Sequence, residues 1–361
     1  MHPVLFKIPG VDWPLHTYGV LIVIGFLCAM LVAWREARRQ NQYVDDVLDF
    51  AFWALLGGMA GARVVFIAVN WKQYFVTNVW DSVGPVAAST AVMGVGLIVA
   101  AIGVLGLGSE GNRAKAFVGA GAVLIVIGKF VVGDTQLGPF SIPAVLVVWK
   151  GGLVFYGAAL GGFIAFLIFA RARGIRGEGM LRLADIVIVG LPLAAAFGRL
   201  GCVAAGCCWG DAAYTLDADG HFHSTIPLAI QFPKGALAYQ SLLETVDGDV
   251  ASAMRAVGHT APLIPIQIID SLGELGLFFI LLFVRSRKWF HGQVLLMYGL
   301  LYPIWRTTLE MFRGDGERGY LIPGVLSTSQ FISLCVATAS LIAIVVVRKR
   351  AMARAALAPT P

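Results

Sequence analysis

Charged residues are scarce in this sequence. Only 13% of its 361 residues are Asp, Glu, Lys or Arg, whereas 58% are apolar, and the mean hydropathy is +0.80. These values exclude an ordinary soluble globular domain as the main body of the chain. Apolar stretches of about 20 residues, long enough to cross a hydrocarbon core of roughly 30 Å, recur along the whole length. The composition therefore predicts an all-α, polytopic integral membrane protein.

The apolar stretches predict about nine transmembrane helices in a single membrane domain, residues 1–347, with a tail at 348–361. We place the helices at residues 14–34, 47–69, 86–107, 114–134, 152–170, 182–200, 266–284, 293–312 and 327–347. The first stretch begins late and is followed by WREARR, so we expect a retained helix and not a cleaved signal peptide.

Lys and Arg gather in every second connection between the predicted helices. These basic connections include Arg35, Arg38 and Arg39; Arg113 and Lys115; Arg171, Arg173 and Arg176; Arg285, Arg287 and Lys288; and Arg348, Lys349 and Arg350. Short loops of this kind stay cytoplasmic, which predicts an outside N-terminus, a cytoplasmic C-terminus and an outside location, as a small cap, for the acidic connection at residues 211–261. The net charge of +6 then reflects topology and contact with anionic membrane lipid. No basic patch interleaved with aromatic residues predicts nucleic-acid binding.

Polar side chains inside the predicted helices fall at one depth, near the outer surface. They are Tyr18, Arg63, Tyr156, Arg199, Gln267, Asp270, Arg306, Glu310 and Arg313. A charge within a helix costs roughly 3 kcal/mol on insertion scales, so each is a candidate for function. The spacing of Arg306, Glu310 and Arg313 predicts one helical face on which the carboxylate holds either arginine. A structural ion pair would explain that triplet, but the excess of guanidinium groups favours a phospholipid phosphate as ligand.

Three cysteines, Cys202, Cys207 and Cys208, cluster after the predicted helix at 182–200. A metal site would need a fourth ligand at typical spacing, and a cysteine nucleophile would need a base, for which only His16 or His2 is available at that level. We predict neither a metal nor another cofactor. The outer compartment of a bacterial membrane is oxidising, which favours a disulfide from Cys202 to Cys207 or Cys208.

The same segment, GRLGCVAAGCCWG at residues 198–210, resembles the signature G-R-x-G-N-x-x-N-x-E-x-x-G of the prolipoprotein diacylglyceryl transferase family. The glycines and Arg199 match, whereas Cys202, Ala205 and Cys207 replace two asparagines and a glutamate. Other family-like segments follow in order: LHTYG, GGMAGAR, GGLVFYG with Tyr156 for a histidine, IQFPKGA, PIQIIDSLGE with Asp270 for a glutamate, and IWRTTLEMFRGD ending at Asp315. The motifs leave residues 80–142 as an inserted transmembrane pair in a family of seven helices.

The resemblance implies a transferase of lipoprotein biosynthesis in the bacterial inner (plasma) membrane, with its site facing the outer leaflet. Such enzymes move the diacylglyceryl group of phosphatidylglycerol to the lipobox cysteine thiol of a prolipoprotein signal peptide. The enzyme's tasks are thiol deprotonation and stabilisation of the phosphate leaving group. We expect the catalytic residues to be Arg199, Arg306, Glu310 and Tyr156. The expected substrate-binding residues are Tyr18, Arg63, Gly157, Gly198, Gly201, Asp270 and Arg313.

Several alternatives stay open from the sequence. A tyrosine with a pKa near 10 is a poor general base at neutral pH, so the thiol proton could go to an activated Tyr156 or to Asp270, or the arginine field alone could lower the thiol pKa. The glycines near these groups are more typical of helix packing than of ligand contact. The chain could also be a paralogue that uses the same lipid site for another reaction, or a non-catalytic lipid-binding or transport protein.

Overall fold

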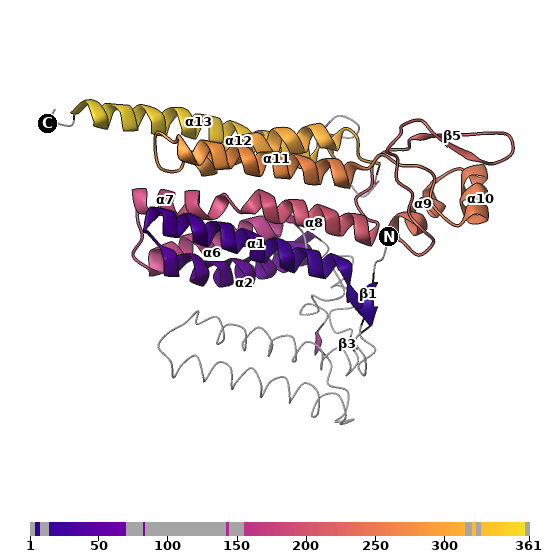
Figure 1. The fold of residues 1–361 in the computed structure, drawn as a ribbon, viewed down its shortest axis with the longest axis horizontal. Coiled ribbons are helices and arrows are strands. Elements are labelled where there is room, and N and C mark those ends of the chain that lie inside the picture. The colour runs from indigo at the N-terminus through magenta and orange to yellow at the C-terminus, as the bar shows by residue number, and fades with distance from the viewer. Residues whose placement is uncertain are drawn as a thin grey trace, which may run out of the picture. The chain divides into compact units, whose positions relative to one another are not determined.

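The computed structural model describes residues 4–7, 14–69, 82–83, 142–143, 155–314, 320–322 and 326–357. Its helices are α1 Thr17–Gln40, α2 Val44–Val69, α6 Phe155–Ala172, α7 Glu178–Ile188, α8 Leu191–Ala205, α9 Leu237–Thr245, α10 Gly248–Val257, α11 Ile266–Ser286, α12 Gln293–Glu310 and α13 Thr328–Leu357 (Figure 1). The chain divides into two compact units: residues 1–40 with 177–361, and residues 41–176.

Short antiparallel strand pairs complete the secondary structure. They are β1 Val4–Lys7 with β2 Pro14–His16, β3 Ser82–Val83 with β4 Ile142–Pro143, β5 Tyr214–Leu216 with β6 Phe222–Ser224, and β7 Tyr320–Ile322 with β8 Leu326–Ser327. Each pair forms a separate two-stranded sheet, so the helices define the architecture.

Five stretches in the described part of the chain are long and apolar enough to cross a membrane. They are Thr17–Gln40, Val44–Val69, Glu178–Ala205, Ile266–Ser286 and Thr328–Lys349. The shorter apolar helix α6 and helix α12 coincide with two further predicted spans. The prediction of an all-α membrane protein is therefore confirmed. The predicted helices at 86–107 and 114–134 lie outside the described residues, and the count of nine and the orientation stay predictions.

The predicted helix at 182–200 consists of two consecutive helices, α7 and α8. The helical path is interrupted at Val189 and Gly190, and Pro192 occupies the first turn of α8. A proline there lacks the N–H that would continue the hydrogen-bonding ladder of α7. Gly190 also allows a close approach of α1, because a Cβ at this position would lie 2.5 Å from the carbonyl oxygen of Ala29.

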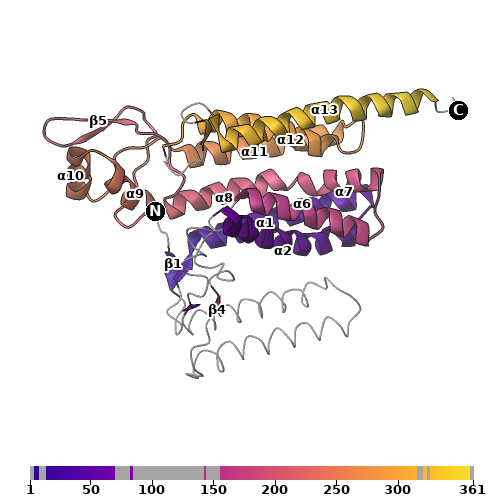
Figure 2. The same ribbon diagram turned by 180° about the vertical axis from the view of Figure 1, so that it is seen from behind.

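The first unit is built by successive packing of helices. Helix α1 packs on α8, α8 on α11, α11 on α12, and α12 on α13, and Figures 1 and 2 both show α11, α12 and α13 side by side. Buried Val189, between α7 and α8, forms one hydrophobic cluster with Phe278 and Leu281 of α11 and Val294 of α12. This packing fixes the relative positions of α8, α11 and α12, which carry most of the predicted site residues.

Glycines mediate the packing of α2 on α6 in the second unit. A Cβ on Gly61 would lie 2.3 Å from the carbonyl oxygen of Gly157, and one on Gly161 would lie 2.1 Å from that of Gly57. Both helices thus present a small-xxx-small pattern to each other, as is common between membrane helices. The close packing favours the structural interpretation of GGMAGAR and GGLVFYGAALGG, including Gly157, and a lipid contact of Gly157 stays a prediction.

The segment after α8 folds around its own small core. Trp209, Phe232, Ala238 and Leu263 are buried together, with helices α9 and α10 and the β5–β6 hairpin around them. Backbone bridges from Leu263 to Ala212 and to Ile230 close the segment on itself. The acidic connection therefore has a defined fold, and its location outside the membrane stays a prediction.

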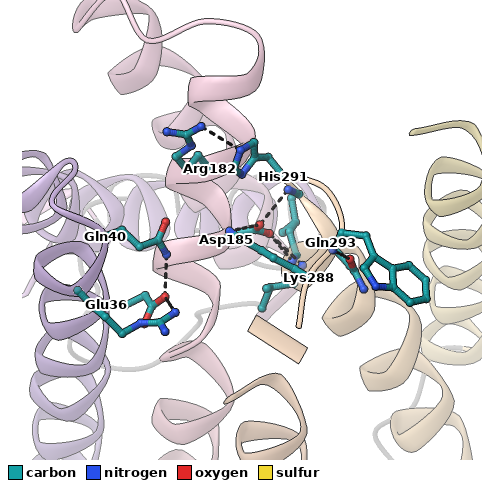
Figure 3. A network of polar contacts seen from close by, with 12 residues as sticks. Glu36, Gln40, Arg182, Asp185, Lys288, His291 and Gln293 are labelled. Atoms are coloured by element: carbon teal, nitrogen blue, oxygen red, sulfur yellow. Dashed lines mark hydrogen bonds and ion pairs between the residues drawn. The ribbon is translucent and has the colours of Figure 1, made fainter. Parts of the chain in front are cut away.

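A buried carboxylate in α7 organises one end of the first unit (Figure 3). Asp185 accepts hydrogen bonds from Lys288 Nζ at 3.0 Å and from the backbone N–H groups of Gly292, Val294 and Leu295 at 2.9, 3.0 and 3.1 Å. The N–H groups of a first helical turn have no partner within the helix. Because Gly292 offers no side chain to cap α12, Asp185 caps that helix from a neighbouring one.

A second buried carboxylate, Glu36 of α1, lies at the same end of the helices. It is 1% exposed and accepts hydrogen bonds from Arg39 Nε at 3.0 Å, Arg39 Nη2 at 2.8 Å and Gln40 Nε2 at 2.7 Å. An ion pair with Arg285 joins it to α11. Both oxygens of Glu36 are engaged, so this charge links α1 to α11.

Candidate active site

Arg199 and Asp270 join α8 to α11 at the other end of the same helices. Arg199 Nε lies 2.6 Å from Asp270 Oδ2, and Trp305 of α12 donates from Nε1 to Asp270 Oδ1 at 3.2 Å. The indole fits there because of Gly273, at which a Cβ would lie 2.1 Å from the ring. Three helices therefore converge on one buried carboxylate.

The guanidinium group of Arg199 retains capacity for a ligand. Its side chain is 22% exposed, whereas that of Asp270 is 6% exposed. A guanidinium has five N–H donors, and among the described residues one carboxylate pairs with it. The predicted arginine is thus held in place by an acid and partly open to its surroundings, which suits recognition of an anionic group.

A polar row extends along α11 and α12 from Asp270. Glu274 lies one helical turn from Asp270, is 2% exposed, and has no hydrogen-bond partner for its Oε2 within the described structure. Tyr298 and Tyr302 of α12 stack with ring centroids 5.4 Å apart and interact electrostatically with Glu274 and Asp270. Our sequence analysis missed Glu274, although its i,i+4 spacing from Asp270 places both acids on one face of a predicted membrane helix.

Arg306 and Glu310 form the ion pair that their spacing predicted. Arg306 Nη2 lies 2.6 Å from Glu310 Oε2, and Glu310 is 4% exposed. The i,i+4 interaction is therefore confirmed.

The prediction that Arg313 shares this helical face is wrong. Helix α12 ends at Glu310, the chain turns at residues 311–312, and Arg313 forms an antiparallel bridge with Gly210. Backbone hydrogen bonds from Asp211 N to Phe312 O at 2.9 Å and from Gly314 N to Trp209 O at 3.2 Å hold the pairing. The end of α12 is thus joined to the segment that follows α8, which places Arg313 beside the cysteines.

Tyr18, Gly198 and Gly201, three of the predicted substrate-binding residues, lie near Arg199, and only Gly201 packs against Tyr18. A Cβ at Gly201 would lie 2.8 Å from the Tyr18 ring, so Gly201 makes room for the tyrosine on α8. Tyr18 interacts electrostatically with Arg199 and is 40% exposed. A Cβ at Gly198 would meet no atom within 4 Å in the part of the chain that is described. Among the described residues, therefore, nothing packs against the backbone of the residue next to Arg199.

Two predicted charged or polar site residues, Arg63 and Tyr156, belong to the second unit. Arg63 is buried in α2, with its guanidinium 5.1 Å from the centre of the Phe66 ring, and Tyr156 lies in the first turn of α6. That these two residues share a site with Arg199 stays a prediction. Asp315, the acid that ends the last family-like segment, lies outside the described residues.

The three clustered cysteines meet because of how α8 ends. Cys207 N donates to Cys202 O at 3.1 Å and Gly206 N donates to Val203 O at 3.3 Å, with Gly206 at a φ of 67°. This is the Schellman pattern, in which the side chains at the two bonded positions, here Cys202 and Cys207, lie close together. Cys208 also has a left-handed backbone, with a φ of 57°.

The three sulfur atoms lie within 4.8 Å of one another, and all three thiols are free in the structure. The predicted disulfide therefore stays a prediction. Hydrogen bonds with the two other thiols and the charges of two nearby arginines, Arg313 and Arg199, lower the pKa of the Cys208 thiol. The cluster thus belongs to the same electrostatic environment as the candidate anion site.

The apolar helices define a membrane protein, and its arginines, held by buried carboxylates at the helix ends, are suited to an anionic group. The family model described as prolipoprotein diacylglyceryl transferase matches residues 3–133 and 138–346, so the chain belongs to this family of transferases. The match includes most of residues 80–142, and the status of that segment as an insertion stays a prediction.

Individual bacterial relatives agree with the family match, two of them over nearly the full length of the chain. A phosphatidylglycerol–prolipoprotein diacylglyceryl transferase from Clostridium tetani is 24% identical over 92% of this chain and 93% of its own. The corresponding protein of Clostridioides difficile is 25% identical over 97% of both chains. That of Ralstonia pickettii is 32% identical over 52% of this chain and 60% of its own. The similarity is low in identity but continuous along the chain.

Proposed function

We propose that this protein transfers the diacylglyceryl group of phosphatidylglycerol to the lipobox cysteine thiol of prolipoprotein signal peptides, the first step of lipoprotein biosynthesis. Family membership and the activity named for the relatives support this function. Within the chain, one observation carries the proposal: Arg199 is held by Asp270, which also accepts a hydrogen bond from Trp305 where three helices meet, and the Arg199 side chain is partly exposed.

The chemistry is an alkyl transfer. The thiolate sulfur attacks the glyceryl carbon that bears the phosphate ester, a C–S bond forms, and the C–O bond to phosphate breaks. The products are a thioether on the peptide and glycerol phosphate, which takes the electron pair of the broken bond. Positive charge aimed at the departing phosphate stabilises it in the transition state.

Arg199 and Arg306 are the proposed phosphate-binding residues. Asp270 positions Arg199 and Glu310 positions Arg306, since each acid lies 2.6 Å from its arginine. Such pairing fixes the direction of a guanidinium before the substrate binds, which lowers the entropic cost of binding. Arg63 and Arg313 would add positive charge, and Tyr18 would orient a lipid oxygen.

Three groups are candidates to accept the proton of the substrate thiol: Asp270, Tyr156 and water. Both oxygens of Asp270 already accept contacts, from Arg199 and from Trp305, so this carboxylate is poorly placed to act as the base. Tyr156 remains a candidate. The arginine field could also lower the pKa of the substrate thiol far enough for water to take the proton.

We place the site at the outer leaflet of the bacterial inner membrane. The alternation of basic connections supports an outside N-terminus and a cytoplasmic C-terminus. In that orientation Arg199, Arg306 and the folded segment around residues 211–261 face the periplasm, where a signal peptide with its lipobox would enter.

The direct test uses the purified protein in nanodiscs that contain phosphatidylglycerol, with a lipobox peptide as acceptor. Thioether formation is followed by mass spectrometry. Arg199→Lys and Arg306→Lys should each raise the KM for phosphatidylglycerol, because lysine cannot bind phosphate with two parallel bonds. Arg255→Lys, an exposed position on α10, is the matched control and should leave the KM unchanged.

Cys202, Ala205, Cys207 and Tyr156 replace Asn, Asn, Glu and His of the family motifs. These replacements favour, as a second candidate function, a lipid-binding protein without transfer chemistry. That function would be favoured if the nanodisc protein retained phosphatidylglycerol but formed no thioether. A thioether with a different thiol acceptor would instead indicate the paralogue.

A further inference from the structure

We propose that Cys202, Cys207 and Cys208 form a binding site for a soft, thiophilic metal ion, with Cu(I) as the ion that fits this donor set best. The three sulfur atoms converge within 4.8 Å of one another and all three thiols are free. Cys202 is buried and the other two are half-buried. Neither the transfer chemistry nor the family signature requires thiols at these positions.

The backbone brings the three thiols together through two separate features. The Schellman turn at Gly206 sets Cys207 against Cys202, five residues apart. Cys208 then adopts a φ of 57°, a left-handed conformation that is uncommon for a residue with a side chain. This turn lets two adjacent side chains point toward one position. Backbone strain of this kind is concentrated at ligand-binding sites, although alone it would not establish one.

The separations suit a metal ion bound by three sulfur ligands. With metal–sulfur bonds of about 2.3 Å, a planar three-coordinate ion holds its sulfur ligands about 4.0 Å apart. Sulfur atoms that already lie within 4.8 Å of one another would need to move by less than about 1 Å to reach that geometry. The site is therefore close to preformed.

The charges around the cluster also suit a bound thiolate site. Arg199 and Arg313 both interact electrostatically with Cys208. Three thiolates with one monovalent cation carry a net charge of minus two, which Arg313 offsets in part and to which Arg199, already paired with Asp270, adds a smaller contribution. A cluster without neighbouring cations would bear that charge uncompensated, at high cost in a half-buried position.

The number of ligands distinguishes between soft ions. Structural zinc is almost always four-coordinate, and among the described residues no His, Cys, Asp or Glu adds a fourth ligand atom within the same distance. In the sequence analysis, the lack of a fourth ligand argued against a metal site. That argument holds for zinc, which needs four ligands, and not for an ion that binds three. Thiolates select Cu(I) by softness, and this ion accepts three ligands.

The test uses the full chain in detergent, reduced and kept anaerobic, and titrated with Cu(I) in competition with the chelator bicinchoninate. We expect one Cu(I) per chain and a new near-ultraviolet absorption from sulfur-to-metal charge transfer. Cys202→Ser and Cys208→Ala should each weaken binding at least 100-fold. The matched control, Cys28→Ser with Cys335→Ser, should bind as the unmodified chain does, because these cysteines lie in other helices.

Three results would overturn the proposal. They are removal of all copper by the chelator, equal loss of binding in the Cys28/Cys335 control, and Zn(II) binding at the same cysteines more tightly than Cu(I). Thermal unfolding of each variant shows whether it is folded, and two independent cluster variants guard against a misfolded one. The predicted disulfide would consume two of the three thiols, so the site exists only in the reduced chain.

Discussion

The two ends of the helices in the first unit both bury carboxylates, but they use them differently. At the Asp185 and Glu36 end, all four carboxylate oxygens accept hydrogen bonds from side chains or from the backbone of α12. At the Arg199 end, Asp270 is paired but Glu274 keeps one oxygen without a hydrogen-bond partner in the described structure. The carboxylates of the first end are saturated, whereas one carboxylate of the second retains an oxygen without a hydrogen-bond partner in the described structure.

This difference separates two reasons for charge within membrane helices. A saturated buried charge links helices and stabilises their packing, whereas an open one is available to a ligand. The comparison predicts that substitutions at the Arg199 end reduce activity in a stable protein. Substitutions at the Asp185 end should reduce stability and leave the activity of each folded molecule intact.

The largest effect is expected for Arg199→Ala. Loss of a guanidinium that stabilises a developing phosphate charge should lower kcat/KM for diacylglyceryl transfer by about 100- to 1,000-fold. The thermal unfolding temperature should fall less than in Asp185→Ala, since Trp305 still donates a hydrogen bond to the Asp270 carboxylate that loses Arg199. Nanodisc assays with a lipobox peptide measure the rate, and a variant that unfolds at much lower temperature would contradict the functional interpretation.

Asp185→Ala should give the largest loss of stability. It leaves Lys288 without its buried partner and the first turn of α12 without its cap, which should cost about 3 to 5 kcal/mol. Asp185→Asn, which can still accept hydrogen bonds, should cost less. Unfolding in detergent is measured by intrinsic fluorescence. If Asp185→Ala instead abolished activity without loss of stability, the division between the two ends would fail.

Glu274→Gln and Glu36→Gln form a matched pair in the two regions. Gln at 274 should lower the transfer rate about tenfold by replacing the carboxyl group beside Asp270 with an amide, with little change in unfolding temperature. Gln at 36 should lower the unfolding temperature, because it breaks the ion pairs with Arg39 and Arg285. Equal effects of the two substitutions on both readouts would remove the distinction.

The cysteine cluster of Cys202, Cys207 and Cys208 lies at the Arg199 end, and we expect a disulfide within it. In protein isolated without reductant, we expect alkylation mapping to find Cys202 oxidised with Cys207 or Cys208. Brief reduction should release both thiols for labelling. If all three cysteines labelled freely before reduction, the predicted disulfide would be discarded.

The smallest effect concerns His291 at the Asp185 end. Burial, with the charges of Arg182 and Lys288, lowers the pKa of His291, so the folded state binds fewer protons than the unfolded state. Stability should therefore be complete above the unfolded pKa near 6.5 and fall as the pH drops below it. His291→Gln should flatten this part of the stability profile. An unchanged slope in the variant would assign the dependence to another group.

Hydropathy alone predicted the helical membrane architecture, because apolar length is a strong constraint in a bilayer. The spacing of Arg306 and Glu310 likewise predicted their ion pair. The predicted position of Arg313 was wrong, because the helix ends at Glu310 and Arg313 pairs with Gly210. No local sequence pattern indicates that long-range contact. The break at Gly190 and the cap from Asp185 also depend on packing between helices distant in sequence.

The most direct test of the central claim is complementation in bacterial cells depleted of their own diacylglyceryl transferase. The intact chain should restore lipidated lipoproteins, and so should Arg255→Lys. Arg199→Ala and Arg306→Ala should not restore them, although they insert at normal levels. Failure of the intact, correctly inserted chain to restore lipidation would contradict the assignment.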